Sequence, residues 1–414
     1  MITTINNKHN KLNVPNLRFK EFQGEWEKFT FDEIAQYKKG PFGSALKKDL
    51  FVPQSENAIK VYEQQNAIKK DWTLSRYYIT KDYFNTHMKQ FVAKAGDLIV
   101  SCAGTIGEVY ELPKDAEEGV FNQALMRVRV NNEIVNKEIF ITVFSSMIDK
   151  FSKIYSNGSA IKNIPPFADL KRTQVYLPCK GEQIVIAQLL RSLDERIATQ
   201  NKIIEDLKKL KSAIIEKVFN GKHSEKLQLN DVGSYIRGLT YSSNDVVEHG
   251  GTLVMRSNNI INGSLLDYNN NVVFVNKQMS AEQQLQNGDV VICMANGSSS
   301  LVGKSSFYDG ICHSPITVGA FCGIYRSKEP IVKWLFQTNK YRRYIWNSLQ
   351  GGNGAIANLN GEDILNMSFS IPNTTIKDTC VKMLTSMDSA LENNMSLCVL
   401  YTLQKQHLLR QMFI

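Results

Sequence analysis

One stretch of the chain, residues 182–221, carries apolar residues at alternating steps of three and four positions. These apolar positions are Leu190, Leu193, Ile197, Ile204, Leu207, Ile214 and Val218. Charged residues occupy much of the remaining surface, and no Pro or Gly occurs before Gly221. This periodicity predicts one long helix with an apolar seam along one side. Two seam positions are polar, Gln200 and Lys211.

The same helical pattern returns at the end of the chain, 194 positions later (413 − 219 = 194). The matching pairs include Leu177 and Ile371, Asp194 and Asp388, and Phe219 and Phe413. The polar seam residues Gln200 and Lys211 recur as Asn394 and Lys405. Polar residues in a seam lower stability but fix the register of paired helices. We expect the helices to pack antiparallel with Gln200 and Asn394 in contact; the alternative is that these side chains simply face solvent.

The segments between the helices are repeated as well. Residues 26–40 align without a gap to residues 224–238, and the run Gly96–Val100 returns as Gly288–Ile292. Short apolar runs between Gly, Asn and Ser predict strands, and residues 138–156 and 331–349 each predict one amphipathic helix. Loop residues differ between the two copies. Two scaffolds of one kind therefore carry two different sets of loop side chains.

This pattern predicts an α+β fold of two similar domains joined by two long antiparallel coiled-coil helices, with an internal pseudo-two-fold repeat. The expected order is a flexible tail at 1–20, a first domain at 21–180, a first helix at 181–221, a second domain at 222–373 and a second helix at 374–414.

Bulk properties narrow the classes of protein only modestly. The chain has 414 residues, a net charge of +9 and seven cysteines without a C-x-x-C pair. That cysteine usage indicates neither a disulfide framework nor a zinc site. No stretch approaches the roughly 20 apolar residues of a membrane span, and no signal peptide precedes the first domain, so we expect a cytoplasmic protein. The basic charge favours a polyanionic partner but is weak support alone.

No motif predicts an active site in this chain. The six histidines lack metal-binding spacing, and no phosphate-binding loop or nucleophile motif is present. Residues 163–167, NIPPF, resemble the tetrapeptide with which amino-methyltransferases hold a flipped adenine, but Ile164 breaks its spacing. Asp97 and Asp289 each follow a glycine at the start of a strand, which indicates structural turns. A self-sufficient DNA adenine methyltransferase and a coiled-coil adaptor without DNA contact stay open as alternatives.

Basic residues interleaved with aromatic, amide and hydroxyl side chains are the remaining signal of function. Lys and Arg neutralise phosphates, while Arg, Asn and Gln read base edges. The candidate DNA-binding residues are Lys38, Lys39, Phe42, Ser44, Lys47, Lys48, Thr105, Asn157 and Lys162 in the first domain, and Arg237, Tyr241, Arg256, Asn258, Asn259, Asn296, Ser298, Lys304, Arg342, Arg343 and Asn353 in the second.

Taken together, the chain resembles the specificity subunits of type I restriction-modification systems. The resemblance rests on V-P-x-L-R-F-x-x-F with E-W-E at Val14–Glu27, on the duplicated domains, and on L-P-C-K-G-E-Q-x-x-I-A-x-L-L-x-x-L-D at Leu177–Asp194. The second helix keeps only part of this pattern, since Ile376-Lys377 replaces Glu182-Gln183. This departure puts equal docking of partners at the two helix ends in doubt.

The resemblance implies two target-recognition domains that read the halves of an asymmetric, bipartite sequence in double-stranded DNA, while partner subunits methylate adenine or cut. It implies a non-catalytic chain that binds two methyltransferase subunits and endonuclease-translocase subunits. S-adenosylmethionine, ATP and Mg²⁺ would belong to those partners, with no metal and no cofactor in this chain.

The long helices would act as a spacer and as the docking surface for partners. A helix of this length spans on the order of 55 Å, against about 34 Å for one turn of DNA. The residues assigned to this role are Leu190, Leu193, Ile197, Gln200, Ile204, Leu207, Ile214, Leu384, Met387, Leu391, Asn394, Tyr401 and Leu408.

Overall fold

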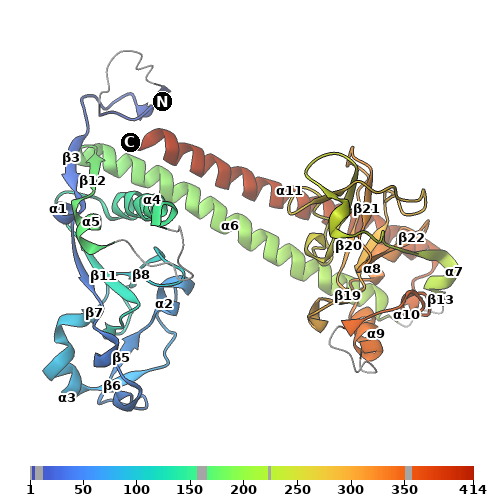
Figure 1. Ribbon diagram of the computed structural model, residues 1–414, viewed down its shortest axis with the longest axis horizontal. Helices are drawn as coiled ribbons and strands as arrows, with labels where there is room; N and C mark the ends of the chain where they lie inside the picture. Colours follow the sequence, from blue (N-terminus) through green and yellow to red (C-terminus); the bar gives the residue numbers. More distant parts are fainter. Residues whose placement is uncertain (1, 5–12, 156–165, 222–224, 350–356) are drawn as a thin grey trace. The chain divides into compact units, whose positions relative to one another are not determined.

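The computed structural model describes residues 2–4, 13–155, 166–221, 225–349 and 357–414 (Figure 1). The chain forms two compact units: unit 1 contains residues 1–197 and 400–414, and unit 2 contains residues 198–399. Each unit holds one α+β domain together with part of both long helices. These helices are α6 (Lys180–Phe219) and α11 (Thr374–Met412), of 40 and 39 residues.

The domain of unit 1 is built mostly of short strands. Its strands are β1 (Ile2–Thr4), β2 (Leu17–Phe19), β3 (Glu27–Thr30), β4 (Ala35–Lys39), β5 (Ala58–Tyr62), β6 (Tyr78–Thr80), β7 (Val92–Ala93), β8 (Leu98–Ser101), β9 (Val109–Glu111), β10 (Gly119–Phe121), β11 (Leu125–Val130) and β12 (Gln174–Leu177). Its helices are α1 (Phe31–Ile34), α2 (Gln64–Lys69), α3 (Lys81–Tyr83), α4 (Lys137–Tyr155) and α5 (Phe167–Arg172), with short turns η1 (Gly43–Ala45), η2 (Lys48–Leu50), η3 (Phe84–Met88) and η4 (Lys89–Phe91).

The domain of unit 2 follows the same plan. Its strands are β13 (Glu225–Gln228), β14 (Gly233–Arg237), β15 (Val246–Val247), β16 (Thr252–Met255), β17 (Val273–Val275), β18 (Val290–Cys293), β19 (Ala295–Asn296), β20 (Ser305–Phe307), β21 (Ile316–Val318), β22 (Cys322–Ser327), β23 (Ala357–Asn358) and β24 (Ser368–Ile371). Its helices are α7 (Leu229–Val232), α8 (Val332–Leu335), α9 (Asn339–Leu349) and α10 (Gly361–Leu365), with turns η5 (Ser243–Asp245), η6 (Ser257–Asn259) and η7 (Ser299–Leu301).

Sheet topology repeats between the units. An antiparallel sheet with the strand order β4-β11-β8-β9 in unit 1 corresponds to β14-β22-β18-β20 in unit 2. Each unit also has a mixed sheet with one parallel pair, β5 with β10 and β16 with β21. A two-stranded sheet next to the long helices pairs β12 with β3 and β24 with β13. The predicted mixed and antiparallel sheets and the internal repeat are thus confirmed.

An ion pair between a buried aspartate and a partly exposed arginine recurs at the same place in both antiparallel sheets. Asp97, just before β8, accepts hydrogen bonds from Nε and Nη2 of Arg129 at 2.7 and 3.0 Å. Asp289, just before β18, accepts them from the same atoms of Arg326 at 2.9 and 2.7 Å. Two parallel bonds of this kind hold a carboxylate firmly. The two aspartates are therefore used structurally, as their place in Gly-Asp turns predicts.

Each domain core takes in the end of one long helix and the beginning of the other. In unit 1, Leu190 of α6 and Met412 of α11 are buried in the same apolar cluster, and the ring of Phe413 lies 6.0 Å from that of Trp26. In unit 2, Phe219 of α6 and Leu384 of α11 are buried together. Burial of such side chains contributes on the order of 2 kcal/mol each. The helices are thus anchored in the domains by their apolar ends.

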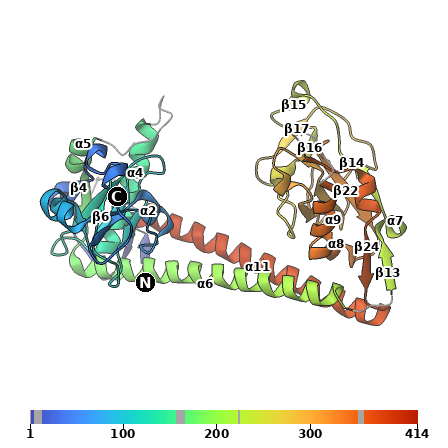
Figure 2. The same ribbon diagram turned by 90° about the horizontal axis from the view of Figure 1, so that it is seen from below.

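The two long helices lie side by side and antiparallel (Figure 2). Within unit 2, Gln200 contacts Asn394, and Lys211, further along α6, contacts Asp388, which is earlier in α11. The contact of Gln200 with Asn394 confirms the predicted pairing of polar seam residues.

The structure corrects two expectations about element bounds. The segment predicted as a flexible tail, 1–20, includes β2, and Arg18 of that strand is buried with its guanidinium 2.7 Å from Glu182. The single helix predicted over 331–349 is divided into α8 and α9. The break occurs at Thr338, whose hydroxyl donates to the Leu335 carbonyl and accepts from the Tyr341 N–H. A threonine that caps the next turn in this way ends one helix and begins another.

Candidate nucleic-acid interface

In unit 1, several loops with candidate residues leave the antiparallel sheet at one end. β4 ends at Lys39, opposite Met126, and β8 ends at Ser101, opposite Leu125. The loops that follow are fixed to the start of β11, because Gly40 N–H donates to Leu125 O and Cys102 N–H donates to Ala124 O. We call this part of unit 1, residues 38–48, 102–107 and 122–124, its loop end.

The loop after β4 presents an unusual side chain to solvent. Phe42 is 89% exposed, whereas its neighbours Pro41 and Leu46 are buried. The Tyr83 hydroxyl donates to Ala45 O at 2.9 Å and fixes the loop in place. Ser44, Lys47 and Lys48 are exposed beside Phe42. An exposed aromatic ring among cations suits stacking on bases next to phosphates.

The other candidates of unit 1 lie at or near this loop end. Lys38 in β4 donates to Gln90 at 2.8 Å and lies over the ring of Phe91, so it is partly engaged within the domain. Lys39 and Thr105 are exposed. Asn157 and Lys162 lie outside the described residues, as does most of the NIPPF stretch.

Unit 2 has the equivalent loop end. β14 ends at Arg237, opposite Gly323, and β18 ends at Cys293, opposite Cys322. Met294 and Ala295 donate backbone hydrogen bonds to Phe321 O, which joins the following loop to the start of β22. We call residues 237–245, 256–258, 294–304 and 319–321 the loop end of unit 2. Counting on from Gly40 and Gly238, Phe42 of unit 1 corresponds to Thr240 and Lys47 to Asp245, whereas Ser44 recurs as Ser242.

Six candidates lie among residues 237–298 of this loop end. Arg237, Arg256, Asn258 and Ser298 are exposed, and Tyr241 is half-buried against Leu239 and Val254. Asn296 joins two of the loops, because its amide donates to the Ser257 hydroxyl at 3.2 Å and accepts from Ser298 N–H at 3.0 Å. Arg256 donates to Asn271 O at 3.3 Å and leaves most of its guanidinium free.

Asn259 is a correction to the candidate set. Its side chain is buried, accepts from Arg256 N–H, and donates to the carbonyls of Asp267 and Asn270 at 3.0 and 2.8 Å. Its repeat partner Asn66 makes the equivalent bonds, accepting from Glu63 N–H and donating to Asp71 O and Leu74 O. An amide with all these bonds made inside the domain has little left for DNA. Asn259 stabilises a loop.

Sequence reasoning missed one residue of this surface. Phe321 is 68% exposed and lies at the loop end of unit 2, between the loops that follow β14 and β18. It stands alone in a run of apolar strand residues, VGAFCGIY, so its sequence context predicts burial. Only the turn between β21 and β22 places it outside. Unit 2 therefore has an exposed aromatic ring at its loop end, as unit 1 has in Phe42.

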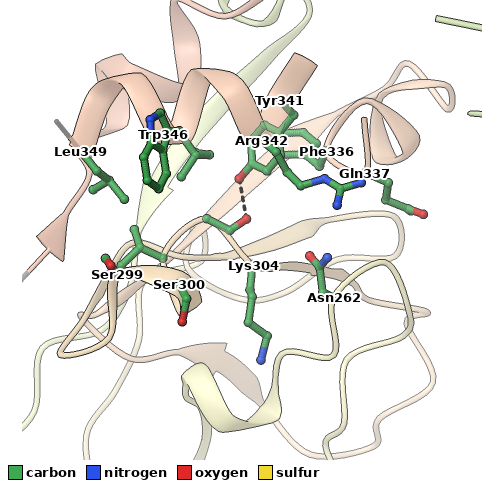
Figure 3. Close-up of a pocket in the computed structure, with 13 residues that line it drawn as sticks. Asn262, Ser299, Ser300, Lys304, Phe336, Gln337, Tyr341, Arg342, Trp346 and Leu349 are labelled. Atoms are coloured by element: carbon green, nitrogen blue, oxygen red, sulfur yellow. Dashed lines mark hydrogen bonds between the residues drawn. The ribbon is translucent and has the colours of Figure 1, made fainter. Parts of the chain in front are cut away.

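Lys304, the last residue of segment 294–304 in the loop end of unit 2, lines a cavity together with Arg342 of α9 (Figure 3). The cavity, of about 390 Å³, lies between the loop that carries Ser299 and Ser300 and the helix α9. Tyr341 of α9 donates to Gly303 O at 2.8 Å, and burial raises its pKa well above the ordinary value, so the phenol stays protonated. Arg343 is exposed outside the cavity lining, and Asn353 lies outside the described residues.

The helix residues assigned to the spacer and to docking are all buried or half-buried. This fits a seam inside the chain, while docking of a partner requires exposed side chains. Exposed apolar residues do occur on the helices: Ile203 and Leu210 on α6, and Leu397, Val399, Leu400 and Leu403 on α11. Glu182 and Gln183 face inward; Gln183 donates to the carbonyls of Ile134 and Pro178. They hold α6 on the domain.

Within the described part of the chain, no group of three or more His, Cys, Asp or Glu side chains could hold a metal ion. Over the same residues, no helix is long and apolar enough to cross a membrane.

Two domains of like topology, each with its own set of loop side chains, define a duplicated α+β protein. Residues 23–209 match the family described as the type I restriction modification DNA specificity domain. The chain is 33% identical over 158 residues to the type I restriction enzyme EcoKI specificity subunit of Escherichia coli (strain K12), and 32% identical over 160 residues to the StySPI specificity subunit of Salmonella potsdam. Each match covers 36% of this chain but only 31% of the relative.

Solved structures show the same fold over nearly the whole chain. The S subunit of a type I restriction-modification system from M. genitalium superposes with a TM-score of 0.56 at 16% identity, covering 97% of this chain and 99% of that one. A second structure, whose title concerns complex assembly and conformational transition of the type I R-M system, superposes with a TM-score of 0.53 at 13% identity. The match covers 93% of this chain and 96% of that one. The predicted resemblance to specificity subunits and the predicted fold class are confirmed.

Proposed function

We propose that this chain binds double-stranded DNA as the specificity subunit of a type I restriction-modification complex. The domain of unit 1 reads one half of an asymmetric bipartite sequence, and the domain of unit 2 reads the other. Partner subunits then methylate adenine in that sequence or restrict DNA that lacks the methyl groups.

The observation that carries this proposal is the pair of loop ends. Their frameworks agree in strand order, in the ion pairs of Asp97 and Asp289 and in the buried Asn66 and Asn259. Most of their exposed side chains differ: Phe42, Lys47 and Lys48 in one, and Arg237, Arg256, Asn258, Ser298 and Phe321 in the other. Side chains that stabilise the shared fold should be the same in both units. The exposed side chains that differ are therefore available to recognise two different DNA sequences.

The long helices support a fixed gap between the two half-sites. α6 has 40 residues, which corresponds to about 60 Å at about 1.5 Å per residue. An unbroken helix paired to a second one resists bending more than a loop does. We propose that helix length sets the gap and that the loop ends set the bases.

Partner subunits carry out the methylation and the cleavage of DNA. Two methyltransferase subunits with S-adenosylmethionine, and endonuclease-translocase subunits with ATP and Mg²⁺, act on the DNA that this chain selects, in the cytoplasm. The exposed apolar residues of α6 and α11 are suited to hold a methyltransferase subunit, because exposed apolar surface on a helix is stabilised by burial against a partner. The chain itself supplies no catalytic residue.

Single-molecule sequencing of methylated DNA tests the proposal. Cells would carry this chain with its methyltransferase partner, and control cells would carry the partner alone. We expect modified adenines in one asymmetric two-part sequence with a constant gap, and exchange of residues 22–176 for those of a relative should change one half only. Identical methylation in both strains, although the complex forms and the partner is active, would contradict DNA recognition by this chain. Binding of S-adenosylmethionine by the isolated chain would favour the methyltransferase alternative.

A further inference from the structure

A cavity of unit 2 lies between the loop 299–304 and helix α9. Its floor is apolar, formed by Val302, Phe336 and Ile345, which are buried. Its rim is polar and cationic, with Asn262, Gln337, Lys304 and Arg342. At about 390 Å³ it falls within the range of small-ligand pockets, roughly 300–1,000 Å³.

Two features of the rim point to the chemistry of a ligand. Trp346, on α9, is 65% exposed and faces the loop that carries Ser299 and Ser300 (Figure 3). Lys304 and Arg342 form no ion pair with any residue that the structure describes, and the cavity lining contains no acidic residue. An exposed indole stacks on planar bases, and unpaired cations attract phosphate. Together they match a nucleotide.

Unit 1 keeps the framework of this place but not its lining. Gly303 turns with a positive φ of 80° and touches Ile345, just as Gly107, with a φ of 82°, touches Ile148. Counting on from these anchors, Lys304 corresponds to Glu108. Glu108 is paired with Lys70 at 2.8 Å.

The same count along the helices pairs Arg342 with Ser145 and Trp346 with Asp149. The cationic and aromatic rim is therefore dispensable for the turn and the helix contact, because unit 1 forms both without it. Because these rim residues occur in unit 2 alone and the fold does not require them, a ligand-binding role explains their presence.

We propose that this cavity binds one nucleotide unit, with the base against Trp346 and the phosphate held by Lys304 and Arg342. The unit belongs either to nucleic acid, as an unpaired nucleotide, or to a free mononucleotide. The first source rests on the proposed function, since the cavity residues Ser299, Ser300 and Lys304 belong to the loop end of unit 2. The second does not.

The test uses the full chain and three probes: deoxyadenosine monophosphate, a duplex with one unpaired 2-aminopurine, and the same duplex fully paired. Isothermal titration calorimetry measures binding of the mononucleotide and of the paired duplex, because Trp346→Asp would itself remove a tryptophan signal. Fluorescence of 2-aminopurine measures binding of the unpaired duplex. Trp346→Asp and Arg342→Ser introduce the residues that unit 1 carries at the same places, so both should fold, which circular dichroism checks. Lys328→Ser, at an exposed residue of unit 2 outside the cavity and outside the candidate DNA-binding set, is the matched control.

We expect both cavity variants to weaken binding of the mononucleotide or of the unpaired duplex about tenfold or more, with less than about a twofold change for Lys328→Ser. Equal losses in all three variants would show diffuse charge attraction and overturn the proposal. A different result would overturn the cavity site and leave DNA recognition intact. In that case every variant binds the paired duplex, and Trp346→Asp changes the affinity for neither the mononucleotide nor the unpaired duplex. Mononucleotide binding that depends on Trp346, without any duplex binding, would uphold the cavity site and contradict the proposed function.

Discussion

Gln200 donates a hydrogen bond of 2.5 Å from its side-chain amide to Oδ1 of Asn394, and the two residues are repeat partners, 194 positions apart (394 − 200 = 194). A residue that meets its own repeat partner lies on the pseudo-two-fold axis relating the helices. The Asn394 amide nitrogen also donates to Ala390 O at 2.6 Å. The pair therefore fixes the register at which the antiparallel helices match.

Replacement of one member of this pair should cost more than replacement of both. Gln200→Leu leaves the Asn394 carbonyl oxygen in the seam without its donor, which costs about 1–3 kcal/mol. The double variant Gln200→Leu with Asn394→Leu removes both polar groups and should be close to the wild type in stability. Urea unfolding followed by far-UV circular dichroism measures the difference. Equal destabilisation in the single and double variants would mean that the pair matters only through its shape.

The two lysines of the seam should differ in their contribution to stability although they are repeat partners. Lys211 pairs with Asp388 at 2.6 Å, both side chains are 6% exposed, and Lys211 also donates to Gly263 O. Lys405 pairs with Asp194, but these side chains are 28% and 56% exposed. Lys211→Met leaves a buried carboxylate short of a partner and should cost about 3 kcal/mol. Lys405→Met should cost less than about 1 kcal/mol. Urea unfolding at pH 7 measures both, and a larger loss for Lys405→Met would contradict this account.

The long helices and the repeat could be predicted because their signals are local: a seam at helical period and two sequences that align. Whether an individual loop residue is exposed or buried could not be predicted in this way. Asn258 and Asn259 are adjacent and chemically identical, yet one is exposed and the other buried with its amide fully engaged. The internal repeat does distinguish them, because Asn259 aligns with Asn66 of the first domain. An asparagine kept in both copies indicates a role in the shared fold. Phe321 gave no such signal, because a turn in three dimensions exposes it.

Exposed aromatic rings at the loop ends should contribute to DNA affinity, each for its own half-site. Phe42→Ala and Phe321→Ala remove rings that are 89% and 68% exposed, so neither should lower the unfolding midpoint noticeably. Loss of a stacked ring should weaken binding of a complete target duplex by about 5- to 100-fold. Fluorescence anisotropy at fixed salt measures this. Ile311→Ala, at a residue 65% exposed, is the control for loss of an exposed apolar side chain.

Half-site specificity gives that experiment a second readout. A duplex scrambled in the half read by unit 1 should no longer distinguish Phe42→Ala from wild type, while Phe321→Ala should still weaken its binding. If both variants lose affinity equally for every duplex, including one with both halves scrambled, the rings contribute no sequence-dependent contact.

Partner docking should depend on the outward faces of the helices and not on the seam. Leu400 and Leu403 of α11 are 59% and 53% exposed. Leu400→Asp with Leu403→Asp leaves the seam untouched, so the chain should fold, but a charge in an apolar interface should reduce capture of the methyltransferase subunit about 100-fold or more. Gln404→Asp with Gln406→Asp, on the same exposed stretch, adds equal charge and is the control. Co-purification of tagged chain with its methyltransferase measures capture.

Shortening both long helices together should shorten the gap between the half-sites. Residues 201–207 of α6 match residues 395–401 of α11 in the repeat, and deletion of both heptads keeps the seam in phase because each loses two helical turns. Seven residues correspond to about 10 Å of helix, or about three base pairs of DNA at roughly 3.4 Å each. Methylation mapping should then show the same two half-sites with a gap about three base pairs shorter. Removing three base pairs from the gap also rotates one half-site by more than a quarter turn around the DNA. The shortened chain could then fail to methylate the original target while each domain still binds its own half-site on a separate duplex. That result would also agree with the helices acting as the spacer. Unchanged spacing in an active complex would rule it out, since no other part of the chain had changed length.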